Sequence, residues 1–200
     1  MGSPATWPPP APERFRCWLR ISSKLCPQRL PDCRRNCVPL EFERETRSAE
    51  ETIAFGAELA AQLRPPVLVL LFGELGAGKT TLAKGIISGL GVARLEDVTS
   101  PTFTLVHAFG NHPRVYHVDL YRISGQAELE SIGLDDLLAE PAVILVEWAE
   151  KLTLRTDWPV IEIRLEAPAA DDRRRLYIRD RAGVLHVEAR PGTFEQEKKR

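Results

Sequence analysis

The residues with the clearest chemical signature occupy positions 73–80, where the sequence reads Gly-Glu-Leu-Gly-Ala-Gly-Lys-Thr. This run satisfies G-x-x-x-x-G-K-[ST], the pattern of a loop that binds the phosphates of a nucleotide. Its glycines let the backbone turn so that successive N–H groups point at phosphate oxygens. Lys79 brings an ammonium group to the β- and γ-phosphates, and Thr80 offers a hydroxyl to Mg²⁺ at the start of a helix. The predicted nucleotide-binding residues of this stretch are Glu74, Leu75, Gly76, Ala77, Gly78, Lys79, Thr80 and Thr81.

A phosphate-binding loop of this kind needs an acidic side chain at the end of another strand to hold the metal, directly or through water. Glu147 follows residues 142–146, the most apolar run after the loop, whereas Asp119 ends a shorter and more polar run. Because Mg²⁺ accepts few protein ligands, we predict Glu147 as the direct ligand beside Thr80. We predict that Asp119 orients the attacking water or bonds a metal-bound water.

Hydrophobic patterning indicates the elements that position these residues. Residues 67–72 form a continuous apolar run before the loop, which is typical of a strand covered on both faces. The helix after the loop has apolar residues at intervals of four and a glycine stop at Gly91. A capping-box pattern at Ser48 predicts another helix before the strand.

Later segments extend the same pattern. Residues 115–119 and 142–146 are predicted strands, and residues 128–138 are predicted to be mostly helical. Residues 160–165 alternate strictly, and two short runs at 175–179 and 184–187 predict a hairpin. Buried strands in the middle and alternating strands at the end predict an α/β fold whose mostly parallel sheet carries antiparallel edge strands.

Composition divides the chain into three parts. Residues 1–40 hold all four cysteines, eight of the sixteen prolines, and seven basic side chains against two acidic ones. With no amphipathic period, this part is expected to be an extension with little stable structure, either dispensable or a targeting segment. Residues 41–190 are expected to form the nucleotide-binding domain, followed by a charged tail at 191–200.

Charge and hydropathy exclude other classes of protein. The last 160 residues carry 20 basic and 26 acidic side chains, which argues against a protein that grips nucleic acid through phosphate contacts alone. The longest apolar run is far shorter than the ~20 residues that span a bilayer, so no membrane segment is expected. The cysteine spacings match no zinc or redox pair, and we expect a reducing, cytoplasmic location.

Four sequence blocks resemble the TsaE family, the small bacterial ATPases required to make threonylcarbamoyladenosine in tRNA. They appear in the family's order and span roughly residues 46–180, which makes the resemblance specific rather than fold-level. The blocks are Gly73-Glu-Leu-Gly-Ala-Gly-Lys-Thr-Thr81, Ser100-Pro-Thr-Phe-Thr-Leu105, Tyr116-His-Val-Asp-Leu-Tyr-Arg122 and Val146-Glu-Trp148.

The resemblance implies a P-loop NTPase fold, ATP with Mg²⁺, and a slow, partner-dependent ATPase in a complex with TsaD- and TsaB-like proteins. That complex forms N6-threonylcarbamoyladenosine in tRNAs that read codons starting with A, so tRNA would be reached indirectly. By the same resemblance, Thr80 and Glu147 would ligate Mg²⁺, and Asp119 would act with Lys79 as a catalytic group at the γ-phosphate. Residues 100–104, including Thr102, would form a switch-like segment that senses the nucleotide.

Two alternative functions are open. A small-molecule kinase would need an acceptor pocket and an Arg-rich lid, and the sequence shows no lid insertion. A nucleotide-gated interaction module with negligible turnover is harder to exclude, because the sequence shows no obvious arginine finger.

His117 is interpreted as a residue that alternates on its strand, and Trp148 as a packing residue.

Overall fold

The computed structural model describes residues 40–152, 154–167 and 172–186. The predicted tail at 191–200, and the predicted extension apart from Leu40, lie outside these residues. In the described part, seven strands form one sheet in the order β1-β7-β6-β2-β5-β4-β3. The strands are β1 (Leu40–Thr46), β2 (Val67–Phe72), β3 (Val106–Phe109), β4 (Val115–Asp119), β5 (Val143–Glu147), β6 (Val160–Glu166) and β7 (Arg174–Asp180). The α-helices are α1 (Ala49–Ala60), α2 (Lys79–Gly89), α3 (Gln126–Ser131) and α4 (Leu134–Leu137).

The centre of the sheet is parallel and its edges are antiparallel, as the sequence predicted. β2 pairs in parallel with β5 and β6, and β5 pairs in parallel with β4. β3, β7 and β1 are antiparallel to their neighbours. Because the carboxyl ends of parallel strands meet at one edge, the loop after β2, Asp119 of β4 and Glu147 of β5 are brought to the same place.

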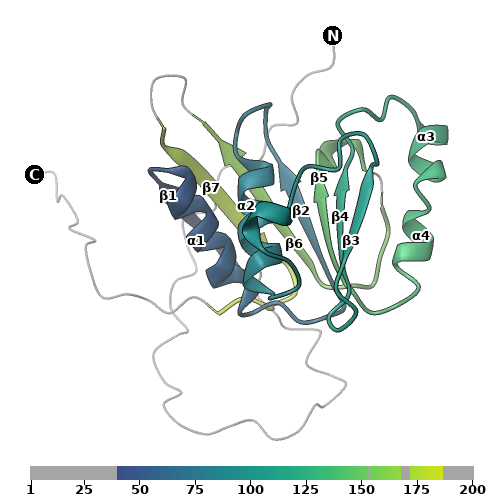
Figure 1. Cartoon of the computed structure of the whole chain (residues 1–200), viewed down its shortest axis with the longest axis horizontal. Helices are drawn as coiled ribbons and strands as arrows, with labels where there is room; N and C mark the ends of the chain where they lie inside the picture. The colour runs from purple at the N-terminus through teal and green to yellow at the C-terminus, as the bar shows by residue number, and fades with distance from the viewer. Residues whose placement is uncertain (1–39, 153, 168–171, 187–200) are drawn as a thin grey trace, which may run out of the picture. The chain divides into compact units, whose positions relative to one another are not determined.

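The sheet is covered on both faces. α1 and α2 lie against one face, where Val67, Val69 and Leu71 of β2 join their apolar residues in one core cluster (Figure 1). Leu68 of β2 points to the opposite face and belongs to a second cluster with Leu129 of α3. This alternation explains why β2 reads as a continuous apolar run, since both of its faces are buried.

Close contact between α1 and α2 fixes the helix that begins at the phosphate loop. A Cβ atom at Gly85 of α2 would lie 2.3 Å from the carbonyl oxygen of Ile53 in α1. A Cβ atom at Gly56 would lie 2.7 Å from the carbonyl oxygen of Leu82. Glycine on each helix therefore permits a backbone approach that any larger residue would prevent.

Several predicted elements are confirmed. The Ser48 hydroxyl accepts a hydrogen bond from the Glu51 N–H at the start of α1, as the capping box predicted. β2 and β4 have the predicted bounds, and Gly91 has a positive φ just after α2. Gly133 separates α3 from α4. β1 was not predicted from the sequence.

The predicted hairpin of residues 175–179 and 184–187 is wrong over the residues that the structure describes. β7 pairs with β6 and β1, and residues 181–186 form no strand. The buried Asp180 carboxylate accepts the backbone N–H groups of Ala182, Gly183 and Leu185 and turns the chain away from β7. Leu185 then enters the core cluster beneath α1 and α2, so its apolar character reflects core packing.

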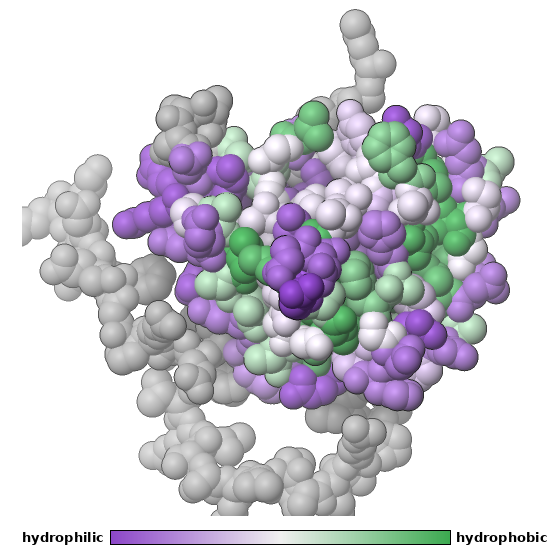
Figure 2. Space-filling model, viewed as in Figure 1, coloured by the Kyte–Doolittle hydropathy of each residue, from purple (hydrophilic) through white to green (hydrophobic). Residues whose placement is uncertain are grey.

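Hydrophilic residues dominate the outline of the molecule in the view onto α1 and α2, with apolar residues in separate areas between them (Figure 2). No helix in the described part of the chain is long and apolar enough to cross a bilayer.

Candidate functional site

The loop between β2 and α2 has the backbone geometry that its glycines allow. Gly73 and Gly78 have φ values of 137° and 102°, which side-chain-bearing residues rarely adopt. A Cβ atom at Gly73 would lie 2.3 Å from the carbonyl oxygen of Leu165 in β6. Gly78 precedes the first residue of α2, so the loop leads into a helix N-terminus, as phosphate binding requires.

Lys79 is buried inside this loop. Its ammonium group donates hydrogen bonds to the carbonyl oxygens of Gly73 (2.7 Å) and Glu74 (2.9 Å). The Nζ atom also lies 3.7 Å from the centre of the Trp148 ring, a cation–π contact. Burial lowers the pKa of the Lys79 amine, and the negative charges of nearby carboxylates, Glu147 first among them, oppose that shift. The effect of burial is the larger of the two, so the pKa of Lys79 lies below its ordinary value.

Glu147 joins the phosphate loop to the neighbouring strand. One of its carboxylate oxygens, Oε2, accepts a hydrogen bond from the Thr80 hydroxyl at 2.8 Å. Its other oxygen, Oε1, lies 2.7 Å from Nε2 of His117 in β4. Glu147 and His117 are buried, at 2% and 0% exposure. A hydroxyl and a carboxylate that meet at this point are oxygen ligands of the kind that Mg²⁺ prefers, so the donor set fits that ion.

Asp119 is held by a different part of the chain. Its Oδ2 atom accepts hydrogen bonds from the hydroxyls of Ser100 (2.5 Å) and Thr102 (2.7 Å). Its Oδ1 atom accepts the backbone N–H of Tyr121 at 2.8 Å. The side chain is 3% exposed, and Asp119 is the register partner of Glu147 across the parallel pair β4–β5. Two buried carboxylates therefore lie next to each other beside the phosphate loop.

The structure brings together most of the residues that the sequence predicted for the site. Thr80 contacts Glu147, Thr102 contacts Asp119, and Lys79 is buried within the loop. Glu74, Leu75 and Gly76 form the exposed outer part of the loop, Ala77 is buried, and Gly78 and Thr81 are half-buried.

Three contacts at this site were not predicted from the sequence. His117 bonds Glu147 and Ser100 bonds Asp119, and the packing role predicted for Trp148 includes contact with Lys79. The available signal for His117 was its position two residues before Asp119, which places both side chains on one face of β4.

Two large apolar side chains close to the site residues are exposed. Phe103, which directly follows Thr102, is 82% exposed, and the Arg122 guanidinium lies over its ring, 4.3 Å from the ring centre. Leu75 in the phosphate loop is 74% exposed.

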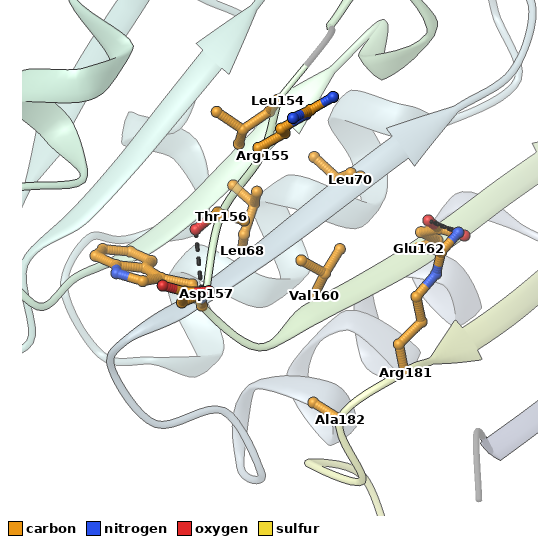
Figure 3. A pocket seen from close by; sticks show the side chains of 11 residues that line it. Leu68, Leu70, Leu154, Arg155, Thr156, Asp157, Val160, Glu162, Arg181 and Ala182 are labelled. Atoms are coloured by element: carbon orange, nitrogen blue, oxygen red, sulfur yellow. Dashed lines mark hydrogen bonds and ion pairs between the residues drawn. The ribbon is translucent and has the colours of Figure 1, made fainter. Parts of the chain in front are cut away.

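An open groove of about 670 Å³ lies apart from this chemistry. Leu68 and Leu70 of β2 and Val160 of β6 form its floor, with the segment at 154–158 along one side (Figure 3). Leu68 faces away from the α1 and α2 side of the sheet, and the lining includes no residue of the phosphate loop. The groove is therefore separate from the candidate nucleotide site.

The fold and the loop together define a P-loop protein of the nucleotide-binding class. The crystal structure of YdiB from Bacillus subtilis is similar, with a TM-score of 0.53 and 32% sequence identity. That similarity covers 72% of this chain and 88% of the YdiB chain.

Sequence comparison identifies the family. The family described as "Threonylcarbamoyl adenosine biosynthesis protein TsaE" matches residues 46–176. The TsaE protein of Bacillus subtilis is 38% identical over 129 residues, covering 64% of this chain and 79% of the relative. That of Streptomyces coelicolor is 44% identical over 120 residues, covering 58% and 79%. The chain belongs to the TsaE family.

Proposed function

We propose that the chain binds ATP with Mg²⁺ and hydrolyses it as a component of the machinery that forms N6-threonylcarbamoyladenosine in tRNAs that read codons starting with A. Relatives such as the Bacillus subtilis protein are named for tRNA threonylcarbamoyladenosine biosynthesis, which supports the pathway. The observation that carries the nucleotide chemistry is the contact of Thr80, at the start of α2, with the buried Glu147.

The phosphate loop binds and orients the nucleotide in this proposal. Backbone N–H groups at the start of α2 and the ammonium of Lys79 contact the phosphates, and Thr80 and Glu147 hold the metal. Bound Mg²⁺ supplies charge neutralisation at the phosphate oxygens. In the structure the Lys79 ammonium bonds the carbonyl oxygens of Gly73 and Glu74. When ATP binds, the ammonium would bond phosphate oxygens in their place, and each such contact joins a cation to an anion.

Asp119 orients the water that attacks the γ-phosphate. In the described structure both of its oxygens already accept hydrogen bonds, from Ser100 and Thr102 on one side and from the Tyr121 N–H on the other. Residues 100–102 must therefore shift before Asp119 can accept a hydrogen bond from water at Oδ2. This requirement favours slow hydrolysis by the isolated chain and faster hydrolysis with partners that move the segment.

The proposed partners are TsaD- and TsaB-like proteins in the cytoplasm, with tRNA reached through the complex. The acidic balance of residues 41–200 supports indirect contact with tRNA, because direct binding would need phosphate-neutralising cations. Family membership favours this pathway over a small-molecule kinase.

A nucleotide-gated interaction module is the second candidate function. The observation in its favour is the same set of bonds around Asp119, because the hydroxyls of Ser100 and Thr102 fill both acceptor positions of Oδ2 and leave that oxygen unable to accept a bond from water. The two candidates differ in one quantity, the rate of ATP turnover in the assembled complex.

The test uses calorimetric titration with ATP, with and without Mg²⁺, and ATP turnover alone and with TsaD- and TsaB-like proteins. Lys79→Ala should lose ATP affinity by roughly 2–5 kcal/mol, because it removes one partner of a buried charged contact. Lys84→Ala, later in α2, is the matched control and should bind ATP normally. Unchanged ATP binding by folded Lys79→Ala would overturn the nucleotide-site assignment, and negligible turnover in the full complex would select the second candidate.

A further inference from the structure

His117 is a buried polar residue whose hydrogen bonds are only half satisfied by the residues that the structure describes. Its side chain is 0% exposed, and Nε2 lies 2.7 Å from Oε1 of Glu147. The other ring nitrogen, Nδ1, is buried and has no hydrogen-bond partner among the described residues. Burying an unpaired polar atom is unfavourable, so an apolar residue would suit the interior of this strand better.

The neighbours of His117 show that the position is suited to an apolar side chain. It lies on β4 between buried Val115 and buried Asp119, and its register partner on β5 is the buried Leu145. The contact that distinguishes His117 from the apolar Val115 and Leu145 is the one with Glu147. A carboxylate is an acceptor, so the ring donates from Nε2–H.

We propose that His117 is a positioning residue that fixes the orientation of the Glu147 carboxylate. The bond from His117 holds Oε1, and this leaves Oε2 directed at Thr80, where the two oxygens lie 2.8 Å apart. Without the imidazole, the carboxylate could rotate about its terminal torsion, which is a soft one. This inference rests on the proposed function, in which Thr80 and Glu147 together hold Mg²⁺.

The role is exerted through Glu147 and leaves the phosphate contacts of the loop unchanged. Groups that hydrogen-bond a metal-ligating carboxylate commonly change metal affinity by 10–100-fold when they are removed. Loss of the His117 bond should therefore weaken the Mg²⁺-dependent part of ATP binding and leave metal-free ATP binding intact. A role limited to packing would change stability without separating these two quantities.

The experiment measures the ATP dissociation constant by calorimetry in EDTA and across a Mg²⁺ titration, for the full chain and three variants. His117→Leu removes the donor at similar bulk, and His117→Gln keeps an N–H donor on a longer side chain. His107→Leu is the matched control, because His107 is the register partner of His117 on β3. Melting temperatures are recorded for all proteins.

Leucine at position 117 should weaken the apparent Mg²⁺ affinity of the ATP complex about 10-fold, with ATP affinity in EDTA unchanged within twofold. Glutamine should recover most of the Mg²⁺ affinity, and the His107 control should match the parent protein. The proposal is overturned if the leucine variant keeps its Mg²⁺ affinity or if glutamine loses as much as leucine.

If His117→Leu does not fold, His117→Asn takes its place, because its shorter amide cannot reach Oε1 from the same backbone position; full Mg²⁺ affinity in that variant overturns the proposal. If the parent chain binds ATP neither in EDTA nor with Mg²⁺, the proposed nucleotide function fails. If the parent binds ATP and His117→Leu keeps the parent's Mg²⁺ affinity, only the role proposed for His117 fails.

Discussion

The two buried carboxylates at the edge of the sheet are held by different kinds of structure. Glu147 is bonded by Thr80 of helix α2 and by His117 of strand β4, both of which belong to packed regular elements. Asp119 is bonded by Ser100 and Thr102, which lie in a loop with no regular secondary structure. The same charge is therefore held by regular elements of the core in one case and by a loop in the other.

This difference fits the two roles proposed for these carboxylates, metal ligand for Glu147 and water-orienting group for Asp119. A metal ligand benefits from a rigid position, because Mg²⁺ demands near-ideal geometry. A group that handles the attacking water can be controlled by a loop, since movement of the loop switches its availability. The loop carries a strained residue, Leu105 with φ of 64°, and an exposed aromatic residue, Phe103, on which a partner could act.

Glu147→Gln should have the largest effect. The change keeps the shape of the side chain and removes its charge, so Mg²⁺-dependent ATP binding should weaken and turnover in the complex should fall by roughly 10²–10³-fold. Single-turnover rates and Mg²⁺ titrations measure both quantities. Normal Mg²⁺-dependent binding by this variant would show that the rigid carboxylate is not the metal ligand.

Asp119→Asn should separate binding from chemistry. Mg·ATP affinity should stay within about twofold of the parent, while hydrolysis in the complex should fall by about 10²-fold or more, as for loss of a general base. The same titrations and single-turnover measurements apply. If this variant loses Mg²⁺-dependent binding and Glu147→Gln keeps it, the two roles are reversed.

Thr102→Val should have a moderate effect on ATP turnover, because it changes only the loop that holds Asp119. It removes a hydroxyl that bonds Asp119, and a hydrogen bond to a charged group contributes about 1.5–3 kcal/mol. We expect a changed rate of turnover and unchanged Mg²⁺ affinity. Thr104→Val, an exposed neighbour in the same segment, is the control. A loss of Mg²⁺ affinity in the Thr102 variant alone would mean that the two carboxylates are coupled.

Removal of residues 1–39 should have the smallest effect. The cut precedes Leu40, the first residue of β1, and both core clusters of the described part are built from residues after that point. The melting temperature and Mg·ATP affinity should stay close to those of the full chain. A large drop in melting temperature would show that this segment contributes to the stability of the domain.

Features that depend on near neighbours could be predicted from the sequence. The phosphate loop follows from a run of eight consecutive residues, and β2 and β4 follow from apolar runs whose bounds the structure reproduces. The start of α1 follows from a local capping pattern at Ser48. In each case the governing interactions are within a few residues of one another, so the sequence pattern records them directly.

Tertiary structure decided the features that depend on distant pairing. The pairing of β1 with β7 joins Leu40 to Asp180, and no local pattern specifies that partner, which is why the predicted hairpin was wrong. Thr80 and Glu147 are 67 residues apart, and His117 and Glu147 are 30 apart. Those contacts exist because parallel strands bring their carboxyl ends to one edge of the sheet, and the order of the strands in the sheet selects which side chains meet there.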